Sequence, residues 1–368
     1  MFPLISSLFN YLFGTDFSWP IPTFGFFVTL SFVLSYLTFR SEFDRKERAG
    51  LIKAFEEKVR VGMRFKLRLF LGYGLMGFLI GFKGWELFSD HGSWYAGVVS
   101  LLVVFVFLFF VQRKSILAPP QVEARTVRPR DLLPILLLWA GLTGFVGARI
   151  FHVFEDNQLF GTHGFMELLD SGGLTFWGGL LFGAASYFYI GIRKGMDWRH
   201  LADIGSLGML VAYGVGRIGC HLSGDGDWGI VTESENPTEW LPQWAWSFRF
   251  PHNVLNQGEY IPGCSGKYCA VLPKGVFPTS LYEAAIILSV FFVLWGVRKN
   301  IKVPGMMFAI YLFVVGIERF LIEFIRVNYK FDIGGVALSE AQLISLALLL
   351  LAVFVAVYLS VKNRTERG

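Results

Sequence analysis

Long apolar stretches dominate this chain and restrict the folds open to it. A helix needs roughly 20 apolar residues to cross a bilayer, and several stretches approach or exceed that length. Only 17% of the residues are charged, against roughly 25% in a soluble globular domain. The sequence therefore predicts an all-α polytopic membrane protein, with a single membrane domain over 1–368. Its nine expected spans cover residues 22–39, 69–88, 96–112, 132–153, 173–192, 202–220, 278–297, 304–326 and 339–361.

The connecting segments alternate in charge. Those at 40–68, 113–131, 193–200 and 298–302, together with the tail after 361, hold 24 of the 33 Lys and Arg residues. The connecting segments on the other side of the expected membrane hold only four basic residues: Arg249, Lys267, Lys274 and Lys330. Because basic loops stay in the cytoplasm, we expect the N-terminus outside and the C-terminus in the cytoplasm.

Three connecting segments carry further expectations. The first 21 residues have no basic stretch before their apolar part, which is unlike a secretory signal peptide and suits a short interfacial helix. The mixed charges of 40–68 predict a solvated cytoplasmic helix. The long outer segment 221–277 is rich in Trp and Pro and is expected to form a small extracytoplasmic cap; a disulfide between its Cys264 and Cys269 is one possibility, and a pair of free thiols the other.

Five basic residues lie within or at the ends of spans, namely Lys83, Arg149, Arg217, Arg319 and Arg326. Lys83 and Arg326 lie near outer ends, where long side chains reach the interface. The other three are costly inside a bilayer and normally face a bundle interior or a wet cavity. Arg149, in GARIFH, is either an interfacial anchor or a functional residue.

Two further segments place acids beside these arginines. In ERFLIEFIR, Arg319 and Glu323 are spaced i,i+4 on one helix face, while Glu318 points elsewhere. The pair either only holds helices together or presents an arginine to an anionic ligand, since its planar fork suits phosphate. In FPTSLYEAA, Glu283 beside Tyr282 either complements a helix dipole or contacts a ligand.

The stretch GVGRIGCHLSGDGDWG at 214–229 resembles the signature of the prolipoprotein diacylglyceryl transferase family, Gly-Arg-x-Gly-Asn-Phe-x-Asn-x-Glu-x-x-Gly. Five more blocks resemble the family in the same order: PIPTFGFFVTLSFVLSYLTFRSE, GARIFHVF, SGGLTFWGGLLFG, PTSLYEA and RFLIEFIR, the last followed by LSEAQLISL. A collinear set is far more specific than any one block. The resemblance covers most of 20–40 and 132–361, so 41–131 reads as an insertion that adds two spans.

The resemblance implies transfer of a diacylglyceryl group from phosphatidylglycerol to the lipobox cysteine thiol of a prolipoprotein in the bacterial inner membrane. It implies no metal or other cofactor, and no nucleic acid is expected as a partner. The family's essential arginines match Arg217 and Arg319, and its acids match Asp225 or Asp227 and Glu323. We expect substrate contacts from a wider set of residues, which comprises Arg149, Gly216, Gly219, Gly229, Trp177, Tyr282, Glu283 and Arg326.

Departures from the family leave the base that activates the thiol open. Trp177 stands where the family often has a His proposed as a base, and Trp cannot accept a proton. Phe24 replaces a Tyr, and Cys220 and His221 replace the signature Asn and Phe. His221 follows Arg217 by four residues, so it is one candidate base; a satisfied polar residue at a span end is the other interpretation.

Two other functions fit the same features. Intramembrane Arg and Glu in Gly-interrupted helices also suit a transporter of an anionic lipid or solute, although the hydropathy shows no inverted repeat. With Trp177 in place of the His, a relative that binds phosphatidylglycerol without catalysis is the second alternative.

Overall fold

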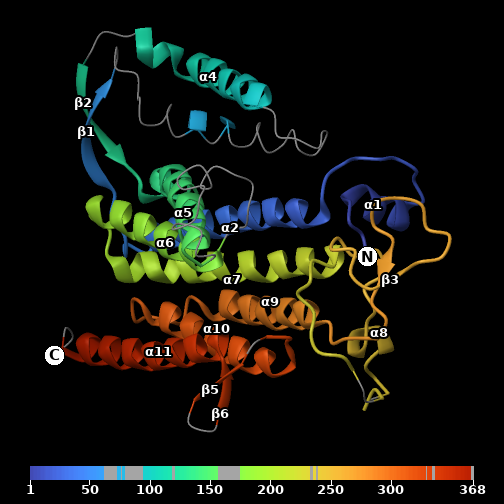
Figure 1. The fold of residues 1–368 in the computed structure, drawn as a ribbon. Helices are drawn as coiled ribbons and strands as arrows, with labels where there is room; N and C mark the ends of the chain where they lie inside the picture. Colours follow the sequence, from blue (N-terminus) through green and yellow to red (C-terminus); the bar gives the residue numbers. More distant parts are fainter. Residues whose placement is uncertain are drawn as a thin grey trace. The chain divides into compact units, whose positions relative to one another are not determined.

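Helices make up most of the computed structural model, which describes residues 1–61, 73–75, 77–78, 94–117, 121–155, 175–232, 235–237, 239–328, 330–333 and 336–365 (Figure 1). The chain divides into two compact units, one of Met1–Glu42 with Ala202–Gly368 and the other of Phe43–Leu201. The expected single membrane domain with an insertion at 41–131 stays a prediction.

Five helices of the described residues are long and apolar enough to cross a membrane: Thr23–Arg48, Pro129–His152, Trp198–Ser223, Thr279–Val297 and Glu340–Thr365. They coincide with five of the nine expected spans. Three further helices, Trp94–Leu117, Phe176–Arg193 and Met306–Ile322, cover all of 96–112 and parts of 173–192 and 304–326. The span at 69–88, with Lys83, lies mostly outside the described residues. The chain is therefore a multi-pass membrane protein, and the count of nine stays a prediction.

The first unit is built around α7 (Trp198–Ser223), which packs between α2 (Thr23–Arg48) and α9 (Thr279–Val297). Its core joins side chains of α7 and α9 to Met307 of α10 (Met306–Ile322), with Phe27 and Leu34 of α2 against them. Glycines of α7 permit this approach, because a Cβ on Gly208 would lie 2.2 Å from the Phe39 ring. In Figure 1, α11 (Glu340–Thr365) runs beside α10.

Polar contacts fix the two ends of this bundle differently. At one end, Asp203 of α7 accepts hydrogen bonds from the backbone N–H groups of Gly305 and Phe308 at the start of α10. Arg298, just after α9, pairs with Glu42 of α2 at 2.8 Å. At the opposite end of the bundle, the C-terminus of α7 lies beside the N-terminus of α9 and the C-terminus of α10. The residues that resemble the family signature lie at this end.

Residues 224–278 fold over that opposite end. They contain α8 (Gln243–Trp246) and a hairpin of β3 (Glu259–Tyr260) with β4 (Ala270–Val271), and Cys264 and Cys269 form a disulfide beside it. Phe250 is 1% exposed and packs against Trp228 and Phe248. The short α1 (Ile5–Phe13) belongs to the same unit.

In the second unit, α5 (Leu133–Glu155) and α6 (Phe176–Arg193) cross at their glycines. A Cβ on Gly178 would lie 2.2 Å from the Gly147 carbonyl oxygen, so the helix backbones touch there. The GARIF segment and the described part FWGG of the other segment therefore pack on each other. The unit also holds the short η1 (Pro129–Leu132) and α4 (Trp94–Leu117).

Three two-stranded antiparallel sheets accompany the helices in the described part of the chain. They are β1 (Phe55–Val61) with β2 (Gln121–Val127), β3 with β4, and β5 (Lys330–Ile333) with β6 (Val336–Ser339). The solvated helix expected over 40–68 is wrong for 49–61, since Gly50 adopts φ 69° just after α2 ends and 55–61 form a strand; residues 62–68 lie outside the described residues. Apart from Glu57, the sequence FEEKVRV alternates apolar and charged residues, a period-two pattern that suits a strand.

Candidate functional site

Charged side chains from four segments meet where α7, α9 and α10 end, next to the cap. Arg217 comes from α7, Glu283 from the first turns of α9, and Asp227 from the loop after α7. Arg326 follows η4 (Glu323–Ile325), the tight turn that continues α10. Arg217 and Arg326 each pair with both Asp227 and Glu283, so the four residues form a closed charge ring.

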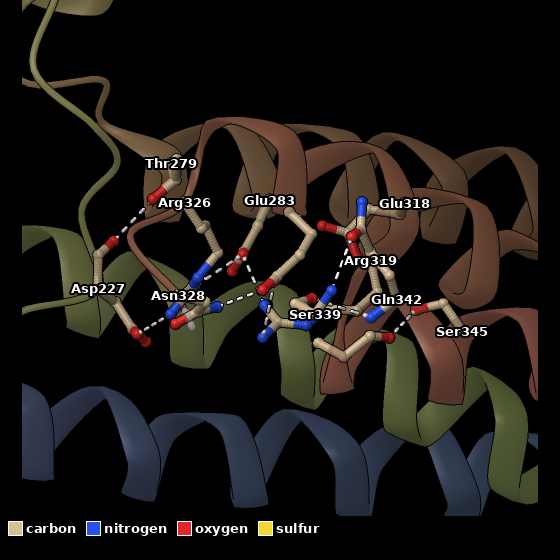
Figure 2. Close-up of polar contacts among 12 residues, drawn as sticks. Asp227, Thr279, Glu283, Glu318, Arg319, Arg326, Asn328, Ser339, Gln342 and Ser345 are labelled. Atoms are coloured by element: carbon tan, nitrogen blue, oxygen red, sulfur yellow. Dashed lines mark hydrogen bonds and ion pairs between the residues drawn. The ribbon is translucent and has the colours of Figure 1, made fainter. Parts of the chain in front are cut away.

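Within this charge ring the bonds are short and the acids are held from both sides. Arg326 lies 2.5 Å from Asp227 and 3.1 Å from Glu283. The Glu283 side chain is fully buried, whereas that of Asp227 is 31% exposed. The Thr279 hydroxyl donates to the Asp227 carbonyl at 2.9 Å, which ties the loop to the start of α9 (Figure 2).

Arg319 extends the charge ring along α10. Its guanidinium lies 3.5 Å from Glu283 and 3.5 Å from Glu323, the i,i+4 partner that the sequence indicated. The Asn328 amide donates to the buried Glu323 carboxylate. At 26% exposed, the Arg319 side chain is the most accessible of the three arginines. Three arginines thus face three carboxylates, a formally neutral group.

The loop from 227 to 230 packs closely against the backbone at Ile325 and Arg326. Gly229 pairs as a β-bridge with Arg326, and the Ile230 N–H donates to the Ile325 carbonyl at 2.8 Å. A Cβ on Gly229 would lie 2.4 Å from that carbonyl oxygen. Gly219 plays a similar part, since its Cβ would lie 2.7 Å from Phe27. Close packing therefore requires both glycines, Gly229 against backbone and Gly219 against the Phe27 side chain, and their expected substrate contacts stay a prediction.

A matched pair of variants checks this packing role. Gly229→Ala is expected to lower the melting temperature and break the Gly229–Arg326 bridge, because the Ile325 backbone cannot move aside as a flexible side chain would. Gly216→Ala meets nothing within 4 Å and replaces a helical glycine, so it should leave the melting temperature unchanged or raise it. Thermal unfolding of both purified variants is the measurement, and equal melting temperatures would contradict the prediction.

Two other expected residues of the first unit, His221 and Tyr282, lie outside the charge ring, and two more belong to the second unit. The His221 imidazole is buried and packs on Phe248 and Phe250, with ring centroids 5.9 and 5.5 Å away. The Tyr282 hydroxyl donates to the Ala245 carbonyl of α8 at 2.5 Å. Arg149 is buried in α5, and Trp177 lies at the start of α6 in the second unit.

Cys220 and Asp225 lie beside the charge ring. The Cys220 sulfur and the carboxylates of Asp225 and Asp227 all lie within 4.8 Å of one another. Burial raises the pKa of Asp225 above its usual value. Burial acts in the same direction on Asp227, but the charges of Arg217 and Arg326 outweigh it and hold that pKa below its usual value. The negative charge of Asp225 therefore lowers the stability of the fold, whereas that of Asp227 raises it.

Their opposite shifts predict opposite effects of neutralisation. An aspartate with a raised pKa in the fold is penalised when charged, so Asp225→Asn should raise the melting temperature near pH 7. That gain should fade as the pH falls towards about 4, where unfolded aspartate takes up its proton. Asp227→Asn should lower the melting temperature near pH 7, and its deficit should shrink only below about pH 4. Thermal unfolding across this pH range checks both, and shifts of the same sign would contradict the assignment.

The sequence profile of the family described as prolipoprotein diacylglyceryl transferase matches residues 87–358 of this chain. The chain belongs to this family. Because the match begins at 87, it includes part of the segment expected as an insertion.

Individual relatives are similar over shorter or longer stretches. Proteins named phosphatidylglycerol–prolipoprotein diacylglyceryl transferase are 31% identical over 248 residues in Leptospira interrogans, 28% over 218 in Mycobacteroides abscessus and 26% over 283 in Lactobacillus delbrueckii subsp. bulgaricus. These matches cover 58%, 57% and 75% of this chain, and 67%, 60% and 90% of the relatives.

The family motifs pointed to most residues of the charge ring and to the Arg319–Glu323 pair, but they missed neighbours such as Tyr213 and Asn328. Glu318 was expected to point away from Arg319 and Glu323; it turns towards α7, where it accepts a hydrogen bond from the Tyr213 hydroxyl at 3.2 Å. Tyr213 could have been found from its spacing, because it lies one helical turn before Arg217. The contact of Asn328 with Glu323 left no signal in the sequence.

Proposed function

We propose that this protein transfers the diacylglyceryl group of phosphatidylglycerol to the thiol of a lipobox cysteine in prolipoproteins, in the bacterial cytoplasmic membrane. The observation that carries the proposal is the group of three arginines held by buried carboxylates at one end of the membrane helices. Such a group suits a phosphate at the level of lipid head groups, because guanidinium forks donate paired hydrogen bonds to phosphate oxygens.

The reaction requires charge stabilisation on the leaving phosphate. The thiolate attacks the glyceryl carbon that bears the phosphate; a C–S bond forms while the C–O bond breaks, and glycerol phosphate leaves with the electron pair. Each arginine has five N–H donors. Arg217 uses Nε and Nη1 for the charge ring, while its Nη2 forms no hydrogen bond with another of the described residues. Pre-positioned donors of this kind stabilise charge as it develops.

The thiol proton needs an acceptor, and Asp225 is the acceptor that this arrangement supports best. Its carboxylate lies beside Asp227 of the charge ring, and its raised pKa makes it a stronger proton acceptor than an ordinary aspartate. The imidazole of His221 packs against aromatic rings of the cap instead.

Two variants separate these candidates for the base. We expect Asp225→Asn to lose about 10²–10⁴-fold in transfer rate although it is the more stable protein, and His221→Ala to retain most of the rate. Both are compared at matched protein amounts with melting temperatures recorded. A fully active Asp225→Asn variant, or an inactive but stably folded His221→Ala variant, would overturn the assignment.

The function itself is tested with purified protein in liposomes that contain labelled phosphatidylglycerol and a peptide with a lipobox cysteine. The expected product is a thioether-linked diacylglyceryl peptide, detected by mass spectrometry, and a peptide with Ser in place of the cysteine is the control. Phosphatidylglycerol binding without any thioether would favour the binding-only relative. Flux of an anionic solute or lipid without thioether would favour a transporter.

A further inference from the structure

An acid next to the charge ring takes no part in it. Glu318 of α10 is only 4% exposed, and it forms no ion pair among the described residues. Its Oε2 accepts the Tyr213 hydroxyl at 3.2 Å, while its buried Oε1 has no hydrogen-bond partner in the described part of the chain. A buried carboxyl with an unsatisfied oxygen costs stability. The retention of Glu318 beside the Tyr213 hydroxyl therefore points to a functional role for this contact.

That contact leads directly to Arg217. Tyr213 lies one turn before Arg217 on α7, and the Arg217 guanidinium carbon lies 5.4 Å from the centroid of the Tyr213 ring. This is a cation–π distance. The carboxyl on α10 therefore fixes the phenol on α7, and the phenol ring supports one side of the guanidinium whose edge is bonded to Asp227 and Glu283.

We propose that Glu318 is a positioning residue that acts through the Tyr213 ring to hold Arg217 in the orientation that receives the lipid phosphate. The proposal rests on the proposed function for its catalytic readout. It needs only an acceptor oxygen at Glu318, because the group that must be held is a hydroxyl. Charge on Glu318 is not required, since the three arginines already have three carboxylate partners.

This requirement gives a test by conservative replacement. Tyr213→Phe, which keeps the ring and loses the hydroxyl, and Glu318→Leu are each expected to lower kcat/KM for phosphatidylglycerol by about tenfold. The double variant should lose no more than either single one, because both remove the same contact. Glu318→Gln, whose amide oxygen still accepts the phenol, should stay within about twofold of the wild type. The matched control is Tyr311→Phe, at a half-buried tyrosine of the same helix α10 that stacks on Phe308.

The outcomes separate this proposal from the proposed function. A Glu318→Gln variant as impaired as Glu318→Leu would overturn it, because charge would then be essential, and so would additive losses in the double variant. If the wild type forms no thioether, the proposed function fails, and phosphatidylglycerol binding measured by native mass spectrometry takes over as the readout. The same ranking of dissociation constants would support the positioning role, and equal binding by all variants would overturn it.

Discussion

Arg217→Ala is expected to lower the rate of diacylglyceryl transfer by about 10²–10³-fold while the protein stays folded and inserted in the membrane. The fold should survive because neither acid is left alone: Arg326 still pairs with Asp227, and both Arg326 and Arg319 still pair with Glu283. The reaction should not survive, because Arg217 joins both acids of the charge ring and has donors left for a phosphate.

Arg217→Lys sharpens this result. A lysine carries the same charge on one flexible nitrogen and cannot reproduce the planar fork. We expect it to lose nearly as much activity as alanine, measured as thioether formation per folded protein. Arg364→Ala, at an exposed position near the end of α11, is the matched control and should behave as the wild type. An Arg217→Ala variant that fails to insert would instead support a purely structural ion pair, and one that transfers normally would refute the role.

Glu283→Ala is expected to damage both stability and catalysis. It removes the one carboxylate that contacts all three arginines, and leaves them with only Asp227 and Glu323. Removing one partner from a buried ion pair costs about 3–5 kcal/mol, and the partly exposed arginines place this case near about 3 kcal/mol. For a chain of 368 residues, that corresponds to a fall in melting temperature of roughly 4 °C.

The kinetic signature of Glu283→Ala should differ from that of Arg217→Ala. The arginines keep their charge and lose their fixed spacing, so we expect kcat to fall while KM for phosphatidylglycerol stays equal or falls. Glu283→Gln, of equal volume, should be less destabilised and still slow. Glu340→Gln, at the exposed start of α11, is the control. A Glu283→Ala variant with a lower melting temperature and a normal kcat would reduce Glu283 to a structural residue.

The sequence was informative about helices and about residues close to one another in the chain. Apolar length located the five long helices, and i,i+4 spacing anticipated the Arg319–Glu323 pair. The partners of Arg217 were harder, because Asp227 and Asp225 are both near it in sequence and only the fold of the loop decides between them. For Glu283 the sequence left two interpretations open, a helix-dipole partner and a ligand contact. Its ion pairs with three arginines could not be predicted, because they depend on the tertiary structure that brings the ends of three helices together.

The strands and glycines show a second limit. The sequence FEEKVRV is short and highly charged, and its pairing with residues 121–127 depends on a contact that lies about 60 residues away along the chain. Gly229 was expected from the sequence only as a substrate contact, and its close approach to the backbone at Ile325 could not be predicted. Short strands and close backbone contacts depend on distant partners, which a local pattern does not contain.

The three arginines of the site and their three carboxylate partners carry no net charge together, and this affects the release of the product. Such a site gains a net negative charge when a lipid with an anionic phosphate enters, and the leaving glycerol phosphate carries still more negative charge. Asp227, Glu283 and Glu323 then repel the product at close range. We expect free glycerol phosphate to be a poor inhibitor, so that the enzyme is readily vacated for the next lipid.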